Sequence, residues 1–404
     1  MRILIIVQNY PPERGAVRYT RDLAVAMAAK GHDVSVITGL PHYPSNVPYE
    51  GYGRFKSVII KEDGVMVIRT PLVMGSNRQK LRRIAGFLTF GLSSLSKAFF
   101  ISRPDVIIAS VPPLTVAPTG LVVSRVHRVP LVMLLRDVEP VCTMELRGLI
   151  DTPLARQIIG FSMYIYNCAD KIVVTHNSQF DALTKYGIPG DKIKTITHGI
   201  DVGQFLKQAE NPVPFSLPRR KGRFIALYLG TIGAAQNIQS LVRAFADQRV
   251  SNLPVDLVII GDGEYALECQ SLVKDNGLEN VKILPPIPLE WVPAILAQAD
   301  ILTCTTYIAG VIGCKFYEYL ASGKPLLVFG VGAGAELVKV IGNGWVCTPC
   351  DGKSLSQILS KFLADPDSAY RMGLRGCHFA EKNFDAFSNY ERWDQLLHSL
   401  LRKA

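Results

Sequence analysis

The feature that most constrains the fold is a regular alternation of short apolar runs with helical patterns along most of the chain. Short apolar runs predict buried strands, and helices between them predict parallel sheets covered on both faces. In the first half the predicted elements are a helix at 17–30 and strands at 3–7, 33–37, 106–109, 131–135, 172–174 and 193–196. In the second half the predicted strands are 224–229, 255–260, 281–284, 301–304 and 326–329.

The alternation is interrupted once, and the interruption predicts a domain boundary. The segment "NPVPFSLPRRKG" at 211–222 is rich in proline and charge, as linkers are. A chain of 404 residues also exceeds the size at which a single core usually stops growing. We therefore expect an α/β protein with two Rossmann-like, doubly wound parallel-sheet domains facing a central cleft, at 1–203 and 223–380, joined by a hinge at 204–222. A C-terminal helix at 381–404 is expected to cross back to the first domain.

The net charge of +10 lies entirely in the first half of the chain. Residues 1–200 carry 24 Lys and Arg against 14 Asp and Glu, whereas residues 201–404 carry 20 of each. A basic surface fits nucleic acid, anionic lipid or a phosphorylated ligand. Nucleic acid is disfavoured, because the basic residues accompany aliphatic runs rather than exposed aromatic stacking platforms.

The sequence predicts a cytoplasmic protein. The opening "MRILIIVQNY" is too short in its apolar part for a signal peptide, and three prolines interrupt the apolar stretch "VIIASVPPLTVAPTGLVV". The eight cysteines are scattered in mostly apolar contexts, which is typical of reduced thiols. Cys347 and Cys350 form a lone C-x-x-C, which is either a redox or zinc motif or a pair of packed thiols.

Glycine-rich turns after the predicted strands are the first candidate binding elements, because doubly wound sheets bind ligands beyond the carboxyl ends of their strands. Gly15 precedes a helix whose free N–H groups could hold an anion. "LGTIGAAQ" and "GDGE" follow the first two strands of the second domain, although the latter could simply be a tight turn. A rival "FGVGAGAEL" resembles a dinucleotide fingerprint, but it lies late in the chain and not at the first strand.

The second candidate element is a short helix before Gly323 and Pro325. Lys315 and Glu318 share one of its faces at i,i+3, between two buried strands. The pair is either a surface salt bridge or the charged part of a site.

In their order and spacing these segments resemble the bacterial glycosyltransferases of the GT-B fold, in particular family four and its branch in O-antigen, capsule and exopolysaccharide assembly, similar to L-fucosamine transferases. The residues that carry the resemblance are "YPPERGAVRYTRDLAVAMAAKGHDVSVITGLPHYP", "PLVMLLRDVEP", "HGID", "LGTIGAAQNI", "GDGEYALE" and "KFYEYLASGKP". The resemblance implies that Lys315 meets the diphosphate of a nucleotide-sugar donor and that Glu318 takes its ribose hydroxyls. The donor-binding set that it implies is Gly15, Gly230, Thr231, Gly233, Gln236, Ile287, Lys315 and Glu318.

Several positions depart from the family pattern. The first glutamate of the Glu-x7-Glu motif is Gly310, and the loop residues that are often arginine and lysine are Thr231 and Asn237. In "DVEPV", Asp137 matches the branch motif while its final glutamate is Val141, with Glu139 nearby. Asp137 is expected to act at the acceptor hydroxyl or the sugar ring, unless it is a helix N-cap.

The resemblance further implies retention of anomeric configuration by front-side attack, with Asp137, Lys315 and Glu318 as catalytic residues and no cofactor. No His, Asp or Glu cluster at metal-ligand spacing is evident in the sequence, so metal-independent transfer is expected. UDP is the expected nucleotide, with GDP as the alternative, and the transferred sugar could be an N-acetylated deoxyhexosamine.

A basic, aromatic-rich segment at 76–103 predicts contact with the inner, anionic face of the cytoplasmic membrane and a polyprenyl-diphosphate-linked acceptor. The alternative is an ordinary helix at the domain edge. His42, Tyr43 and Glu139 are candidates for the acceptor side. Two other functions stay open: a catalytically silent nucleotide- or partner-binding protein, favoured by Gly310, and a sugar-nucleotide epimerase.

Overall fold

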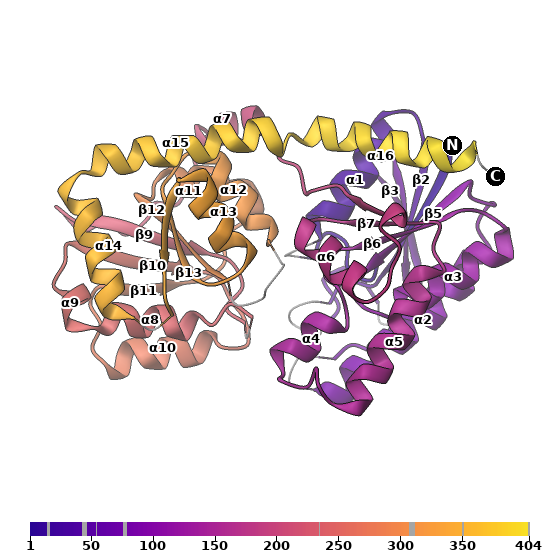
Figure 1. Ribbon diagram of the computed structural model, residues 1–404, viewed down its shortest axis with the longest axis horizontal. Helices are drawn as coiled ribbons and strands as arrows, with labels where there is room; N and C mark the ends of the chain where they lie inside the picture. Colours follow the sequence, from indigo (N-terminus) through magenta and orange to yellow (C-terminus); the bar gives the residue numbers. More distant parts are fainter. Residues whose placement is uncertain are drawn as a thin grey trace. The chain divides into compact units, whose positions relative to one another are not determined.

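A computed structural model describes residues 1–13, 17–42, 47–53, 55–75, 79–233, 235–306, 312–349 and 351–402. The chain forms two compact units (Figure 1). Unit 1 contains Met1–Thr197 together with Ser388–Ala404, and unit 2 contains His198–Phe387. Gly15, Tyr43, Gly310 and Cys350, which the sequence singled out, lie outside the described residues.

Unit 1 is built on an eight-stranded sheet in its described residues, with the order β3-β4-β2-β1-β5-β6-β7-β8. Its strands are β1 (Arg2–Ile6), β2 (Asp33–Gly39), β3 (Val58–Glu62), β4 (Val65–Thr70), β5 (Val106–Val111), β6 (Leu131–Leu135), β7 (Lys171–Val174) and β8 (Ile193–Thr195). Its helices are α1 (Arg18–Ala29), α2 (Lys80–Ala98), α3 (Val116–His127), α4 (Val141–Leu146), α5 (Pro153–Asn167), α6 (Asn177–Lys185), the 3₁₀ turn η1 (Gly190–Lys192) and most of α16 (Ala386–Leu401). Every residue of β5 and β6 is buried, because helices cover both faces of a parallel sheet.

The edge of this sheet is an antiparallel hairpin that the sequence prediction missed. β3 pairs with β4 so that Val58 opposes Arg69, whereas the other strand pairs of the sheet are parallel. Asp63 and Gly64 form the turn, with φ angles of 49° and 80°. An Asp-Gly pair with both φ angles positive is the preferred two-residue hairpin turn, so "EDGV" held a signal for this hairpin.

Unit 2 is built on a six-stranded, parallel sheet in its described residues, with the order β11-β10-β9-β12-β13-β14. Its strands are β9 (Phe224–Leu229), β10 (Val255–Ile260), β11 (Val281–Leu284), β12 (Ile301–Thr306), β13 (Leu326–Gly330) and β14 (Gly344–Cys347). Its helical elements are α7 (Val202–Ala209), α8 (Ile238–Ala246), α9 (Gln248–Ser251), α10 (Ala266–Asp275), η2 (Leu289–Trp291), α11 (Val292–Ala297), α12 (Cys314–Ala321), α13 (Ala333–Ile341), α14 (Gly352–Ala364) and α15 (Pro366–Asn383). β14 was not among the predicted strands.

The segment expected as a hinge, 204–222, lies within unit 2. It contains most of α7, and Phe205 and Leu217 are buried in one of the cores of this unit. Arg219 and Arg220 anchor the segment through ion pairs with Asp300 and Asp256. The proline and charge of this stretch therefore serve packing and pairing on unit 2.

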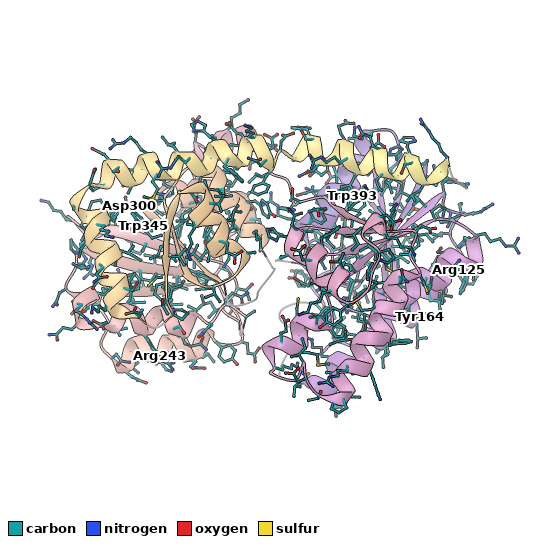
Figure 2. The ribbon with its side chains drawn as sticks, in the orientation of Figure 1. Arg125, Tyr164, Arg243, Asp300, Trp345 and Trp393 are labelled. Carbon is teal, nitrogen blue, oxygen red and sulfur yellow. The ribbon has the colours of Figure 1, made fainter. Side chains whose placement is uncertain are left out.

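The C-terminal helix α16 packs on unit 1. Trp393, labelled in Figure 2, is 1% exposed in the core that includes β1 and α1. Its indole nitrogen donates a hydrogen bond of 3.1 Å to the hydroxyl of Tyr19 on α1. Across the described ranges, no helix has both the length and the apolar content that crossing a bilayer requires.

Candidate functional site

Each sheet has a position where successive crossovers leave the central strand in opposite directions. In unit 2 the first strand, β9, lies between β10 and β12, and in unit 1 the first strand, β1, lies between β2 and β5. Ligands of doubly wound sheets bind outside the carboxyl ends of the strands at such positions.

Two loops at the carboxyl ends of β9 and β10 are in direct backbone contact. A Cβ at Gly261 would lie 1.9 Å from the backbone oxygen of Gly230, and one at Gly263 would lie 2.5 Å from that of Ile232. The amide of Ile232 donates to the oxygen of Asp262 over 2.9 Å, which continues the sheet ladder into the loops. Gly261 and Gly263 therefore serve close backbone packing that fixes the loop after β9.

The sheet opens between β9 and β12 just below this loop. Within the described residues the two strands pair only at Ala226 and Leu227 of β9, so Leu229, the last residue of β9, has no described strand partner on that side. The hydroxyl of Tyr319 on α12 takes the place of that partner. It accepts a hydrogen bond of 2.9 Å from the amide of Leu229 and donates one of 3.2 Å to its oxygen. The same helix that carries Lys315 therefore supports the strand end at the opening.

Lys315 projects into this opening. Its Nζ lies 3.9 Å from the centroid of the Tyr228 ring and 3.2 Å from the position of a Cβ on Gly230. The nitrogen is buried and has no hydrogen-bond partner among the described residues. A buried ammonium without an acceptor is costly unless an anionic ligand completes it.

The surroundings of Lys315 are otherwise neutral. The hydroxyl of Tyr228 donates to the oxygen of Thr231 over 2.7 Å. Burial raises the pKa values of Tyr228, Tyr319 and the Cys304 thiol, so these groups stay protonated near neutral pH and bring no negative charge to the lysine. Lys315 does not pair with Glu318 on the next turn of α12, so the hypothesis of a surface salt bridge between them is wrong.

The other members of the expected donor set fall into two places. Thr231, Gly233 and Gln236 lie on the loop after β9, where the amide of Gln236 donates to the oxygen of Gly233 over 3.1 Å. Asn237, with a φ of 42°, then begins α8. Ile287 is 8% exposed and packs in a core of unit 2.

In unit 1, Asp137 and Glu139 follow β6. The residue at the N-cap position of α4 is Pro140, without a side-chain cap, so the alternative that Asp137 caps this helix is wrong. Burial raises the pKa of Asp137, and neighbouring Arg136 acts in the opposite direction. Burial also raises the pKa of Glu139, which accepts a hydrogen bond of 2.8 Å from Thr143. The two carboxyl groups are close enough for Asp137 to contribute to the raised pKa of Glu139.

His42 belongs to a buried charged cluster near the carboxyl ends of β2 and β4 that the sequence did not reveal. Its amide donates to Oε1 of Glu13 over 3.0 Å, and its Nδ1 lies 2.9 Å from the oxygen of Leu40. Arg69 on β4 is fully buried, lies 5.2 Å from the ring centroid of Tyr52 and has no hydrogen-bond partner for Nε or Nη1 in the described chain. The sequence around Arg69 does not reveal this cluster, because the residues near it, Glu13, His42 and Tyr52, come from other segments of the chain.

Cys347, the described half of the C-x-x-C, is buried. Its Sγ lies 3.5 Å from the oxygen of Thr348, and burial raises the pKa of the thiol to about 11. A thiol with a raised pKa is a poor nucleophile and a poor metal ligand. This residue therefore behaves as a packed thiol.

Comparisons with known proteins identify the family. The family described as "Glycosyl transferase 4-like domain" matches residues 14–199, and "Glycosyl transferases group 1" matches residues 210–377. WcaI of Escherichia coli K12, by name a colanic acid biosynthesis glycosyl transferase, is 26% identical over 74% of this chain and 75% of its own. Among solved structures, sucrose-phosphate synthase of Thermosynechococcus elongatus superposes with a TM-score of 0.76 at 17% identity over the whole of both chains. HepE of Anabaena in complex with UDP-glucose superposes with a TM-score of 0.70 at 19% identity, over 99% of this chain and 100% of its own. The chain belongs to glycosyltransferase family four and has the GT-B fold.

Proposed function

We propose that this glycosyltransferase transfers a sugar from a UDP-sugar to a lipid-linked or polysaccharide-precursor acceptor in bacterial surface glycan synthesis, with retention of anomeric configuration. The single observation that carries the donor assignment is the buried Nζ of Lys315, which has no hydrogen-bond partner among the described residues and lies beside Gly230 at the opening between β9 and β12. A diphosphate supplies the anionic oxygens that this ammonium lacks. Support for the glycan class comes from the name of WcaI as a colanic acid biosynthesis enzyme, and support for UDP comes from the HepE complex with UDP-glucose.

In the proposed reaction, the diphosphate oxygen of the donor leaves the anomeric carbon while the acceptor hydroxyl attacks from the same face. The departing oxygen takes the hydroxyl proton, and Lys315 stabilises the negative charge that develops on the diphosphate. This role requires no metal ion. Glu318, one turn after Lys315 on α12, accepts hydrogen bonds from the ribose hydroxyls.

Asp137 is proposed to hold the acceptor hydroxyl or to steady positive charge on the sugar ring, with Glu139 beside it. Its support is its position after β6, the finding that it does not cap α4, and a pKa raised by burial. Carboxyl groups with perturbed pKa values at a strand end are typical of functional sites.

The first experiment measures binding and donor hydrolysis. We expect UDP to bind the purified protein, and one member of a panel of UDP- and GDP-sugars to be hydrolysed slowly without acceptor. Lys315→Ala and Glu318→Ala should abolish the hydrolysis. Binding of nucleotide without turnover of any donor, even with membrane lipid extracts as acceptor, would favour the silent binding protein. Conversion of the donor to an isomeric nucleotide sugar would favour the epimerase.

The membrane contact rests on helix α2. Its side chains Leu81, Ile84, Leu88 and Leu92 are all more than half exposed and recur at three- and four-residue spacing, so they form one apolar stripe. Arg82 and Arg83 are exposed on the same helix. An exposed apolar stripe flanked by cations is typical of helices that lie in an anionic bilayer surface.

Vesicle co-sedimentation tests this contact. We expect the protein to bind vesicles containing anionic phospholipid and to bind zwitterionic vesicles weakly. Leu88→Glu should reduce the bound fraction. Leu267→Glu, at a leucine of α10 in unit 2 that is 70% exposed against 56% for Leu88, is the matched control and should leave the bound fraction unchanged. Equal losses for the two variants would exclude α2 as the contact.

A further inference from the structure

Three potential metal ligands meet where α16 packs on unit 1. His32 lies between α1 and β2, and Asp394 and His398 lie one turn apart on α16. The ligand atoms of the three side chains lie within 4.8 Å of one another. Figure 1 shows α16 beside α1, and the sequence separation of 362 residues between His32 and Asp394 explains why no sequence spacing reveals the cluster.

The two imidazoles converge on one carboxylate oxygen. Nε2 of His32 lies 2.7 Å from Oδ1 of Asp394, and Nε2 of His398 lies 3.5 Å from the same oxygen. A zinc ion with ligands at about 2.0–2.2 Å in a tetrahedron separates its ligand atoms by about 3.3–3.6 Å. The distance from His398 to Asp394 already has this value. The distance from His32 to Asp394 is that of a direct hydrogen bond, and a bound ion would move these two atoms apart.

The backbone around the cluster is held in place. The amide of His32 donates to the oxygen of Met27 on α1 over 3.2 Å. One turn before Asp394 on α16, Glu391 forms an ion pair with Lys30 at the end of α1. Nδ1 of His32 lies 3.4 Å from the amino nitrogen of Met1. The His32 side chain is 8% exposed, whereas that of His398 is 53% exposed and leaves an open side for water as a fourth ligand.

We propose that His32, Asp394 and His398 bind a divalent transition metal, with zinc as the ion that suits two imidazoles and one carboxylate. The site contains no residue of the proposed donor site, and it joins α16 to the loop before β2. The bound metal holds the C-terminal helix on unit 1. An alternative use of the same side chains is a metal-free His–Asp hydrogen-bond pair.

Titration calorimetry of the full-length, EDTA-treated protein with ZnCl₂ tests the proposal, together with visible absorption after addition of Co²⁺. We expect one Zn²⁺ per chain, tetrahedral Co²⁺ absorption bands and a rise in the melting temperature on adding zinc. His398→Ala should weaken zinc binding by about tenfold or more and remove the thermal shift, because loss of a ligand costs at least as much affinity as loss of a group that hydrogen-bonds to a ligand. Asp394→Asn, which keeps the shape of the side chain, should do the same.

His378→Ala is the matched control, because His378 is an exposed histidine of α15 outside the cluster. It should leave stoichiometry, affinity and thermal shift unchanged. Zinc binding that survives both His398→Ala and Asp394→Asn, or that falls equally in His378→Ala, would show an adventitious ion only. Absence of any zinc binding to the wild-type protein would favour the metal-free pair. UDP binding, measured on the same variants, should be unchanged whatever the outcome.

Discussion

Replacing Lys315 with methionine separates the proposed ligand-binding role of this residue from a structural one. Methionine keeps much of the length and apolar volume of the lysine and removes the buried charge, for which the described part of the chain provides no hydrogen-bond partner at Nζ. A buried charged donor without a partner destabilises the fold by about 1–3 kcal/mol or more. The contact with the Tyr228 ring at 3.9 Å offsets this by about 1–2 kcal/mol. The free energy of unfolding should therefore stay unchanged or rise by about 1 kcal/mol.

The effect on the ligand should have the opposite sign. A hydrogen bond between the ammonium and a phosphate oxygen contributes about 1.5–3 kcal/mol to binding. Its loss should raise the Kd for UDP by about 10- to 150-fold, which calorimetry measures while urea unfolding reports stability.

Lys324→Met is the matched control. Lys324 also lies over an aromatic ring, 5.8 Å from the centroid of Tyr370, but it precedes β13, at the end of the sheet opposite to Lys315. This control should leave UDP binding unchanged. Binding of UDP by Lys315→Met within about twofold of the wild type, or unfolding of this variant at markedly lower urea concentration, would contradict the ligand-binding role of Lys315.

Three further predictions concern two residues that hold the backbone of the donor site in place, Tyr319 and Gly261, and the acidic residue Asp137. Tyr319→Phe leaves the amide of Leu229 without its acceptor and should lower the free energy of unfolding by about 1–3 kcal/mol, as urea unfolding would show; an unchanged midpoint would mean that water replaces the hydroxyl. Gly261→Ala places a Cβ 1.9 Å from a backbone oxygen, so it should lower the free energy of unfolding by about 1–3 kcal/mol and weaken UDP binding. Gly313→Ala, whose Cβ would have nothing within 4 Å, is the control and should change neither. Burial raises the pKa of Asp137 above 3.8, so the folded state binds this proton more tightly than the unfolded state does. The contribution of Asp137 to the free energy of unfolding therefore falls as the pH rises from 3.8 through the raised pKa. Asp137→Asn should therefore lose this pH dependence and unfold at higher urea concentration at pH 7, with glycosyl transfer impaired and UDP binding retained; unimpaired transfer would contradict the proposed role.

The sequence predicted the two α/β sheets because buried parallel strands need near-continuous apolar runs, and such runs survive in the sequence as a local pattern. Strands β6, β9, β10 and β11 have the predicted bounds. The hairpin β3–β4 was missed although its Asp63-Gly64 turn is a local signal. The family pattern also indicated Lys315, since its motif is a contiguous stretch of sequence.

The rest was decided by contacts between residues far apart in the chain. The sequence could not tell whether the ammonium of Lys315 was exposed or buried, because its surroundings come from Tyr228 and Gly230, more than 80 residues earlier. Gly261 and Gly263, which the sequence left as possible turn residues, allow the backbones of two loops to pack against each other. The cluster of His32, Asp394 and His398 exists only because α16 packs beside the first helix of the chain. Local patterns record which residues are buried and in what element, whereas the pairing of charges depends on tertiary packing, which no local pattern encodes.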